Sequence, residues 1–134
     1  MLDWLVSIQL PEGGFQGGTV GAKPVVPVAF NTGQIVLGLA SGVTCFGSAY
    51  RAAMIRAADW LVRVQDEDGG WRKFQSPFAG PGEHVYDVHI AWGLIEAARL
   101  EPTRGYEEAA LHHIRWVSQY QHSNGWVALC CQED

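Results

Sequence analysis

The stretch Gln65-Asp-Glu-Asp-Gly-Gly-Trp71 decides the fold, because the chain repeats its pattern at a fixed interval. A glutamine, a glycine turn and an aromatic residue recur with even spacing along the chain, and the third turn aligns as one residue shorter. Such regular recurrence is typical of repeat proteins, in which each unit packs on its neighbours. The structural motif residues are Gln9 with Phe15, Gln65 with Trp71, and Gln121 with Trp126.

Each repeat contains two helical patterns. The first precedes the glutamine and carries an apolar stripe at helical spacing, as at Ala53, Ala57 and Trp60. We expect Trp60, Trp71 and Trp116 to be buried. The second follows a loop rich in Gly and Pro, spans 31–40 and 87–98, and is apolar nearly all round. We therefore predict charged outer helices and a buried inner layer, in which small residues let the backbones approach closely.

Local signals predict where the inner helices begin and end. Asn31 with Gln34 resembles a capping box, and Asp87 is a suitable N-cap for the second inner helix. Gly42 is a plausible stop for the first, and Pro102 lies beyond the second.

The 134 residues form one predicted domain, with repeats over about 1–47, 48–102 and 103–134. A net charge of −5 at pH 7 argues against a nucleic-acid partner, which requires a basic face. The hydrophobic share of 48% excludes intrinsic disorder. About two and a half repeats suggest a piece of a longer array, a chain that completes its layers by self-association, or a small protein with short capping ends.

The cysteines and the apolar runs bear on location. An odd number of cysteines, two of them adjacent at Cys130 and Cys131, does not form a disulfide framework and favours a reduced, cytoplasmic context. The first residues lack the pattern of a signal peptide. The apolar runs are short and interrupted by Pro or Gly, so we expect no membrane span, which needs about 20 residues.

The pattern Gln-x-x-x-Gly-Gly-Trp after Trp60-Leu61 is similar to the QW repeat of squalene and oxidosqualene cyclases. The helix pairs also resemble protein prenyltransferase β subunits, and the resemblance covers the whole chain. It implies an all-α fold, an incomplete α/α toroid whose inner helices line a cavity. It also implies that the Gln and Trp side chains tie one helix hairpin to the next, and that the domain handles an apolar isoprenoid-type ligand.

The chain departs from the catalytic motifs of that family. Class II cyclases use an Asp-x-Asp-Asp acid, whereas Asp66-Glu67-Asp68 lies within a repeat turn, where we expect solvent-facing residues. Protein prenyltransferases bind zinc through Asp, Cys and His. The weak counterparts here are Asp87, His89 and Cys130, with His84 and Cys131 near them. We predict no zinc and no other cofactor, and whether the chain is an enzyme stays open.

We expect the starts of the inner helices to line a ligand cavity, with loops 16–29 and 72–86 forming its rim. The predicted lining residues are Gln34, Asp87, His89 and Trp92, together with Thr32. Asp87, His89 and Glu83 are weak catalytic candidates, since Glu83 and Asp87 could form an acid–base pair in a carbohydrate-active toroid. A non-catalytic helical-repeat binding module is the other alternative. His113 lies on an apolar stripe and is predicted to be a core histidine.

An incomplete toroid would leave apolar faces of the inner helices open at its sides. Exposed apolar patches usually mark interfaces, so we predict a homodimer with a two-fold axis. The residues expected at these faces are Ile35, Val36, Leu37, Ile90, Trp92 and Leu94.

Overall fold

The computed structural model describes residues 1–80 and 82–131, and their regular structure is helical, which confirms the all-α prediction. No strand occurs within these two ranges. The α-helices are α1 (Leu2–Ser7), α2 (Ala29–Phe46), α3 (Arg51–Val64), α4 (His89–Leu100) and α5 (Tyr106–Ser118). Short 3-10 turns are η1 (Ser48–Tyr50), η2 (Arg72–Phe74) and η3 (Tyr86–Val88).

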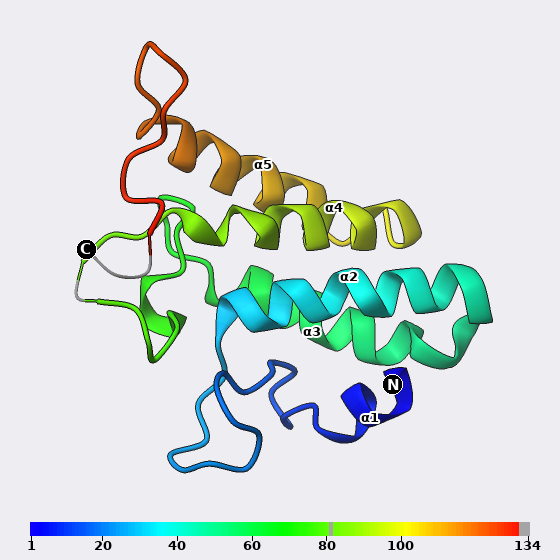
Figure 1. Cartoon of the computed structure of the whole chain (residues 1–134). Helices are drawn as coiled ribbons and strands as arrows, with labels where there is room; N and C mark the ends of the chain where they lie inside the picture. Colours follow the sequence, from blue (N-terminus) through cyan, green and yellow to red (C-terminus); the bar gives the residue numbers. More distant parts are fainter. Residues whose placement is uncertain (81, 132–134) are drawn as a thin grey trace.

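Helices α2 and α4 lie side by side and run in the same direction, while α3 and α5 run back in the opposite direction (Figure 1). Each inner helix packs on the outer helix that follows it, α2 on α3 and α4 on α5. The loops that precede α2 and α4 lie at the same end of the molecule. In the described residues, α2 and α4 therefore alternate along the chain with α3 and α5, which run in the opposite direction.

Two glycines bring the inner helices into backbone contact. A Cβ atom on Gly33 would lie 2.8 Å from the Cα atom of Ile90, and one on Gly93 would lie 2.5 Å from the Gly33 carbonyl oxygen. Any side chain at either position would push α2 and α4 apart. This confirms the predicted role of small residues, although Gly38 does not share it, because a Cβ there would meet its nearest neighbour at 3.9 Å.

The ends of α2 differ from the prediction. Asn31 lies inside the helix, which begins at Ala29 without a side-chain cap. Gly42 lies inside the helix and does not end it. The lack of a side chain at this position makes room for Leu2 and Tyr50. The helix ends at Phe46, and the next residue, Gly47, has a φ of 78° that is accessible mainly to glycine.

The start of α4 also differs. Asp87 lies in η3, and α4 begins at His89 without a side-chain cap. The Asp87 carboxylate is instead directed at the outer layer, as described below. Pro102 lies beyond Leu100, the last residue of α4, as predicted.

The glutamines tie each turn to the outer helix of the next repeat. Gln9 Nε2 donates to the carbonyl of its own turn and to that of Ala53 in α3, each at 2.9 Å. Gln65 Nε2 donates to its own turn at 3.1 Å and to Ala109 in α5 at 3.0 Å. The two copies thus use the same pair of acceptors, with the second acceptor 44 residues along the chain in both.

The third turn is not shorter than the other two, which corrects the sequence alignment. Gly125 lies one repeat interval after Gly69 and has a positive φ, as Gly69 does. His122 N donates to Trp126 O at 2.7 Å, as Asp66 N donates to the carbonyl of the second glycine in the second turn. Trp126 therefore stands where the earlier turns have their second glycine, and Val127 stands at the aromatic position.

The tryptophans of the outer helices and the second turn differ in burial. Trp60, Trp71 and Trp116 are 2%, 1% and 4% exposed, as predicted. Trp60 is covered by the first turn, where a Cβ on Gly14 would lie 3.0 Å from its ring. Trp4 is 53% exposed.

Three of the residues expected at open faces are buried. Val36, Ile90 and Leu94 belong to the hydrophobic core between the helices, so the prediction that they are exposed is wrong. Trp92 is 56% exposed, while Ile35 and Leu37 are half-buried. The close approach of α2 and α4 at Gly33 explains why the core closes over Ile90.

Within the described residues, α2 is the helix that is long and apolar enough to cross a bilayer by length and composition alone. Core helices meet the same two criteria, and α2 packs here against α1, α3 and α4.

We expect Trp60→Ala to lower the free energy of unfolding by about 3–5 kcal/mol, because the indole is buried between the first turn and the core. Urea unfolding measures the change. Trp92→Ala is the control, since a largely exposed residue should cost less than about 1 kcal/mol. Similar losses for both variants would contradict the burial of Trp60.

The glutamine tie predicts a difference between two otherwise identical substitutions. Gln65→Ala removes the bond to α5 and leaves the Ala109 carbonyl without its donor, so we expect a loss of about 1–3 kcal/mol. Gln121→Ala removes only a 3.4 Å bond within an exposed turn and should be nearly neutral. Chemical unfolding of both variants tests this, and equal losses would show that the tie does not stabilise the repeat contact.

Candidate functional site

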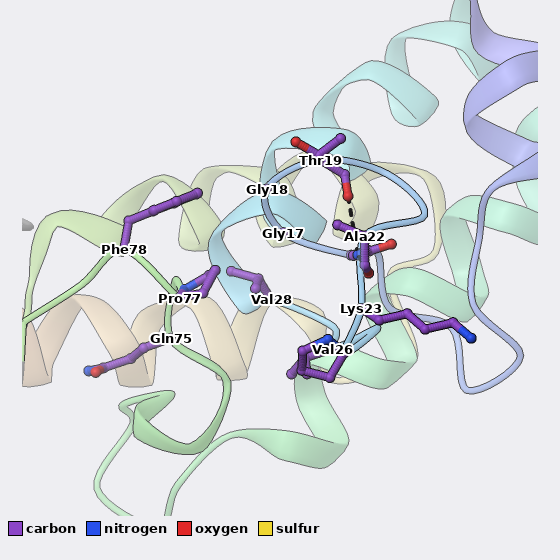
Figure 2. Close-up of a pocket in the computed structure, with 12 residues that line it drawn as sticks. Gly17, Gly18, Thr19, Ala22, Lys23, Val26, Val28, Gln75, Pro77 and Phe78 are labelled. Carbon is purple, nitrogen blue, oxygen red and sulfur yellow. Dashed lines mark hydrogen bonds between the residues drawn. The ribbon is translucent and has the colours of Figure 1, made fainter.

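A cavity of about 390 Å³ lies between the loops that precede the two inner helices. The first loop contributes residues from 16 to 28 and the second contributes residues from 75 to 78 (Figure 2). These are parts of the two loops predicted to form a rim. The lining residues are Gln16, Gly17, Gly18, Thr19, Ala22, Lys23, Pro24, Val26, Val28, Gln75, Pro77 and Phe78.

The Gln16 side chain shapes the first loop. Its Nε2 donates to the Ala22 carbonyl at 2.7 Å and to the Thr19 carbonyl at 3.3 Å, and its Oε1 accepts from Gly21 N at 3.0 Å. Ala22 N also donates to Thr19 O, the bond drawn as a dashed line in Figure 2. One side chain thus closes residues 16–22 into a ring and fixes one wall of the cavity.

The remaining walls are mainly apolar. A Cβ on Gly17 would lie 2.5 Å from Val28 Cγ2 and 3.4 Å from Pro77 Cδ, so only glycine lets the two loops meet there. The Phe78 ring approaches Gly18 from the second loop and is 65% exposed. The ammonium group of Lys23 points away from Phe78 and Pro77 (Figure 2). The arrangement suits an apolar ligand.

None of the predicted lining residues of the inner helices borders this cavity. Gln34 is half-buried on α2, while His89 and Trp92 are exposed on α4. The Phe30 ring packs edge-on against Tyr86 at 5.4 Å and against His89 at 6.2 Å between ring centroids. Thr32 is buried, where its Oγ1 accepts from Phe15 N at 2.9 Å.

Asp87 faces the outer layer. Its Oδ1 lies 3.4 Å from His113 Nε2 of α5, and both side chains are buried. His113 Nδ1 is 2.8 Å from the Gly69 carbonyl. Because a carbonyl oxygen only accepts hydrogen bonds, the His113 Nδ1 atom that faces Gly69 carries a proton. A hydrogen bond between His113 Nε2 and the Asp87 carboxylate would need a second proton between these two atoms.

Aromatic rings enclose this pair. His113 lies between Trp71 and Trp116, at 4.6 Å and 5.4 Å between ring centroids. The histidine therefore joins the second glycine turn, the start of α4 and α5 in one buried contact, as predicted for a core histidine.

Arg72 holds the acidic turn together. It pairs with Asp66 at 3.2 Å, with Asp68 at 2.6 Å and with Glu83 at 2.6 Å. Its guanidinium also lies 5.3 Å above the centre of the Trp116 ring. The hydrogen bonds from Arg72 lower the pKa of Asp68 to about 2. The stability that this pairing contributes is therefore complete above pH 3.8 and is lost as the pH falls through about 2.

The two carboxylates considered as an acid–base pair have different partners. Glu83 binds Arg72 in the turn, and Asp87 faces His113. His89, the third catalytic candidate, contacts the Phe30 ring. The structure does not join these three residues into one site.

The zinc candidates likewise do not form a common site among the described residues. His84 lies against main-chain carbonyls, with Nδ1 2.9 Å from Cys131 O and Nε2 2.8 Å from Gly80 O. Cys130 and Cys131 are exposed. Across residues 1–80 and 82–131, no three His, Cys, Asp or Glu side chains gather as a metal site would require.

Sequence reasoning placed the rim but missed what builds it. The sequence signals that could have indicated the cavity walls were Gln16 beside Gly17-Gly18 and the pair Pro77-Phe78. These residues lie outside the repeated motif of glutamine, glycine and aromatic residue. The role of Arg72 was also missed, although this arginine directly follows the motif tryptophan at the end of the acidic turn.

Comparisons with protein-family models, with curated proteins and with solved structures found no match for this chain. The resemblance to the cyclase and prenyltransferase repeats therefore rests on the repeat residues themselves.

We expect Asp87→Asn to fold with nearly unchanged stability, because the amide can donate to His113 Nε2 without a further proton. Neither His113 Nε2 nor Asp87 Oδ1 has a hydrogen-bond partner at their separation of 3.4 Å, and Asp87→Ala removes the carboxylate that could pair with a proton on that nitrogen, so it should cost about 1–3 kcal/mol. Thermal unfolding at pH 7 measures both variants. If both lose the same stability, the Asp87–His113 contact does not act through a hydrogen bond.

Proposed function

We propose that the chain is a partial α/α toroid of the terpenoid-cyclase and prenyltransferase type and that it binds an apolar isoprenoid-type ligand. The observation that carries the proposal is the cavity of about 390 Å³ between loops 16–28 and 75–78. Its volume falls within the usual range of ligand sites, about 300–1,000 Å³. The repeated glutamine ties and the alternating helix layers support the toroid assignment.

The lining accounts for the ligand class. Val26, Val28, Pro77 and Phe78 supply apolar walls, and the loop's hydrogen bonds to Gln16 are directed at its own backbone. A branched hydrocarbon chain could bury its surface against these walls without leaving polar groups unpaired. A strongly polar ligand, such as a sugar, would find few side chains here to replace its bonds to water.

A second candidate is a non-catalytic helical-repeat binding module. It is favoured by the ion pairs of the acidic residues. Arg72 binds Asp66, Asp68 and Glu83, so these carboxylates are engaged within the turn and are not free to act as acids. Incubation with farnesyl diphosphate and a thiol acceptor separates the two candidates. A prenyltransferase-type enzyme would move the farnesyl group to the thiol sulfur and release diphosphate, whereas a binding module would only retain the ligand.

Binding of farnesol, measured by calorimetry, tests the cavity. Phe78→Ala removes an aromatic wall of the cavity and should weaken binding about tenfold. Aromatic contacts contribute about 0.5–1.5 kcal/mol, and the substitution also removes the apolar surface of the ring. Phe46→Ala is the matched control, because Phe46 is similarly exposed, at 71%, and lies at the other end of α2. Equal affinity for both variants, or no binding, would contradict the proposal.

A further inference from the structure

The third glycine turn lacks the helix contact that covers the first two turns. Helix α3 covers the first turn, where Gly13 and Gly14 are buried, and α5 covers the second turn in the same way. In the third turn, Gly125 and Trp126 are exposed, and a Cβ on Gly125 would meet no described atom within 4 Å. This turn projects from the end of α5 in Figure 1. Within residues 1–80 and 82–131, one of three equivalent turns is therefore uncovered.

The backbone of the third turn already has the conformation of the covered turns. Gly125 N donates to His122 O at 2.9 Å, as Gly69 N donates to Asp66 O at the same distance. The φ angles of Gly125 and Gly69 are 87° and 103°. A helix could dock on this turn without rearranging it, so binding would carry little cost of ordering the turn.

The covered turns show which groups of a helix this surface receives. The turn glutamine donates to an alanine carbonyl, and the first glycine lies against the carbonyl three residues later. These carbonyls belong to Ala53 and Arg56 for the first turn, and to Ala109 and His112 for the second. Among the described residues, Gln121 bonds only its own turn, at 3.4 Å, so its amide can donate to a further carbonyl.

Trp126 changes the kind of helix that fits. In the first turn, a Cβ on Gly14 would lie 3.0 Å from the ring of Trp60, which follows the bound alanine by seven residues. A side chain at this glycine position therefore projects toward the covering helix. Trp126 holds the position in the third turn and is 68% exposed. A helix with a small residue seven positions after its bound carbonyl leaves room for this indole, whereas a second tryptophan would compete for the same space.

A hollow of about 440 Å³ lies beside the third turn, and its lining is mainly apolar. At the position of Val127, the covered turns have Phe15 and Trp71, each 1% exposed, whereas Val127 is only half-buried. Burying this surface under a helix would remove apolar area from water, which favours binding. The lining residues are Gly125, Trp126, Val127, Leu129, Cys130 and Cys131.

We propose that the third turn binds an α-helix of a partner protein that carries small residues at two positions seven apart. The first small residue presents its carbonyl to Gln121, and the second receives the Trp126 indole. The docked helix continues the outer layer, because it lies beside α5 as α5 lies beside α3. The outer helices of a second copy do not fit, because they carry Trp4, Trp60 or Trp116 at the position that has to be small.

A peptide with the sequence of α3, residues 51–64, and the change Trp60→Ala is the probe. A hydrocarbon link between positions 52 and 59 keeps the peptide helical. Ala52 is exposed and Asp59 pairs with Arg104, so neither side chain is needed at the turn. Calorimetry should show one peptide bound per chain. We expect this peptide to bind at least tenfold more tightly than the linked peptide that keeps tryptophan at position 60.

Exchanging the two bulky positions supplies the matched control. In a Trp126→Gly protein the preference should reverse, because the tryptophan peptide then packs as Trp60 packs on Gly14. Gln121→Ala should weaken binding several-fold, because the bond to the peptide carbonyl is lost. Phe46→Ala should leave the affinity unchanged, since Phe46 is similarly exposed, at 71%, and lies at the end of α2.

The third turn shares no residue with the loop cavity, so peptide binding and farnesol binding can succeed or fail separately. Absence of peptide binding, or equal affinity for both peptides in both proteins, would overturn the proposal. Sedimentation across a dilution series tests the remaining occupant. Self-association that Trp126→Gly abolishes would assign the surface to a second copy and would overturn the partner helix.

Discussion

The hydrogen bond from a turn glutamine to an alanine carbonyl of the next outer helix is the contact on which the rest of the structure depends. Gln9 and Gln65 each reach 44 residues along the chain to make it. The bond requires the turn backbone to touch the helix, and Gly13 and Gly69 permit this with positive φ angles and no side chain. Once the outer helices are fixed in this way, the inner helices are held at the separation that Gly33 and Gly93 allow.

The even spacing of the repeats was enough to predict the helix order, the two layers and the burial of Trp60, Trp71 and Trp116. These features follow from periodicity, which a sequence displays directly. The helix ends were harder to predict, because Gly42 has the composition of a stop but is used for close packing against Leu2 and Tyr50. Local sequence does not distinguish a glycine needed for its conformation from one needed for its small size.

In the candidate site, too, some features could be predicted from the repeat and others could not. The two rim loops could be predicted, because they lie between helices of known order. The direction of Asp87 could not, because it depends on His113, which belongs to a different helix and replaces an alanine of the preceding repeat. The third turn was misaligned for a related reason. Trp126 looks like the motif aromatic, but the repeat interval and the hydrogen bonds of the turn both show that it stands at a glycine position.

The reach of the glutamine ties has a consequence for folding. A turn cannot complete its hydrogen bonds until the outer helix of the next repeat has formed, so each tie closes a long loop before it contributes stability. A single hairpin of this chain would leave its glutamine amide and its turn glycines without their partner helix. The repeats should therefore fold as one cooperative unit and not one after another, in contrast to longer arrays whose units add nearly independent increments of stability.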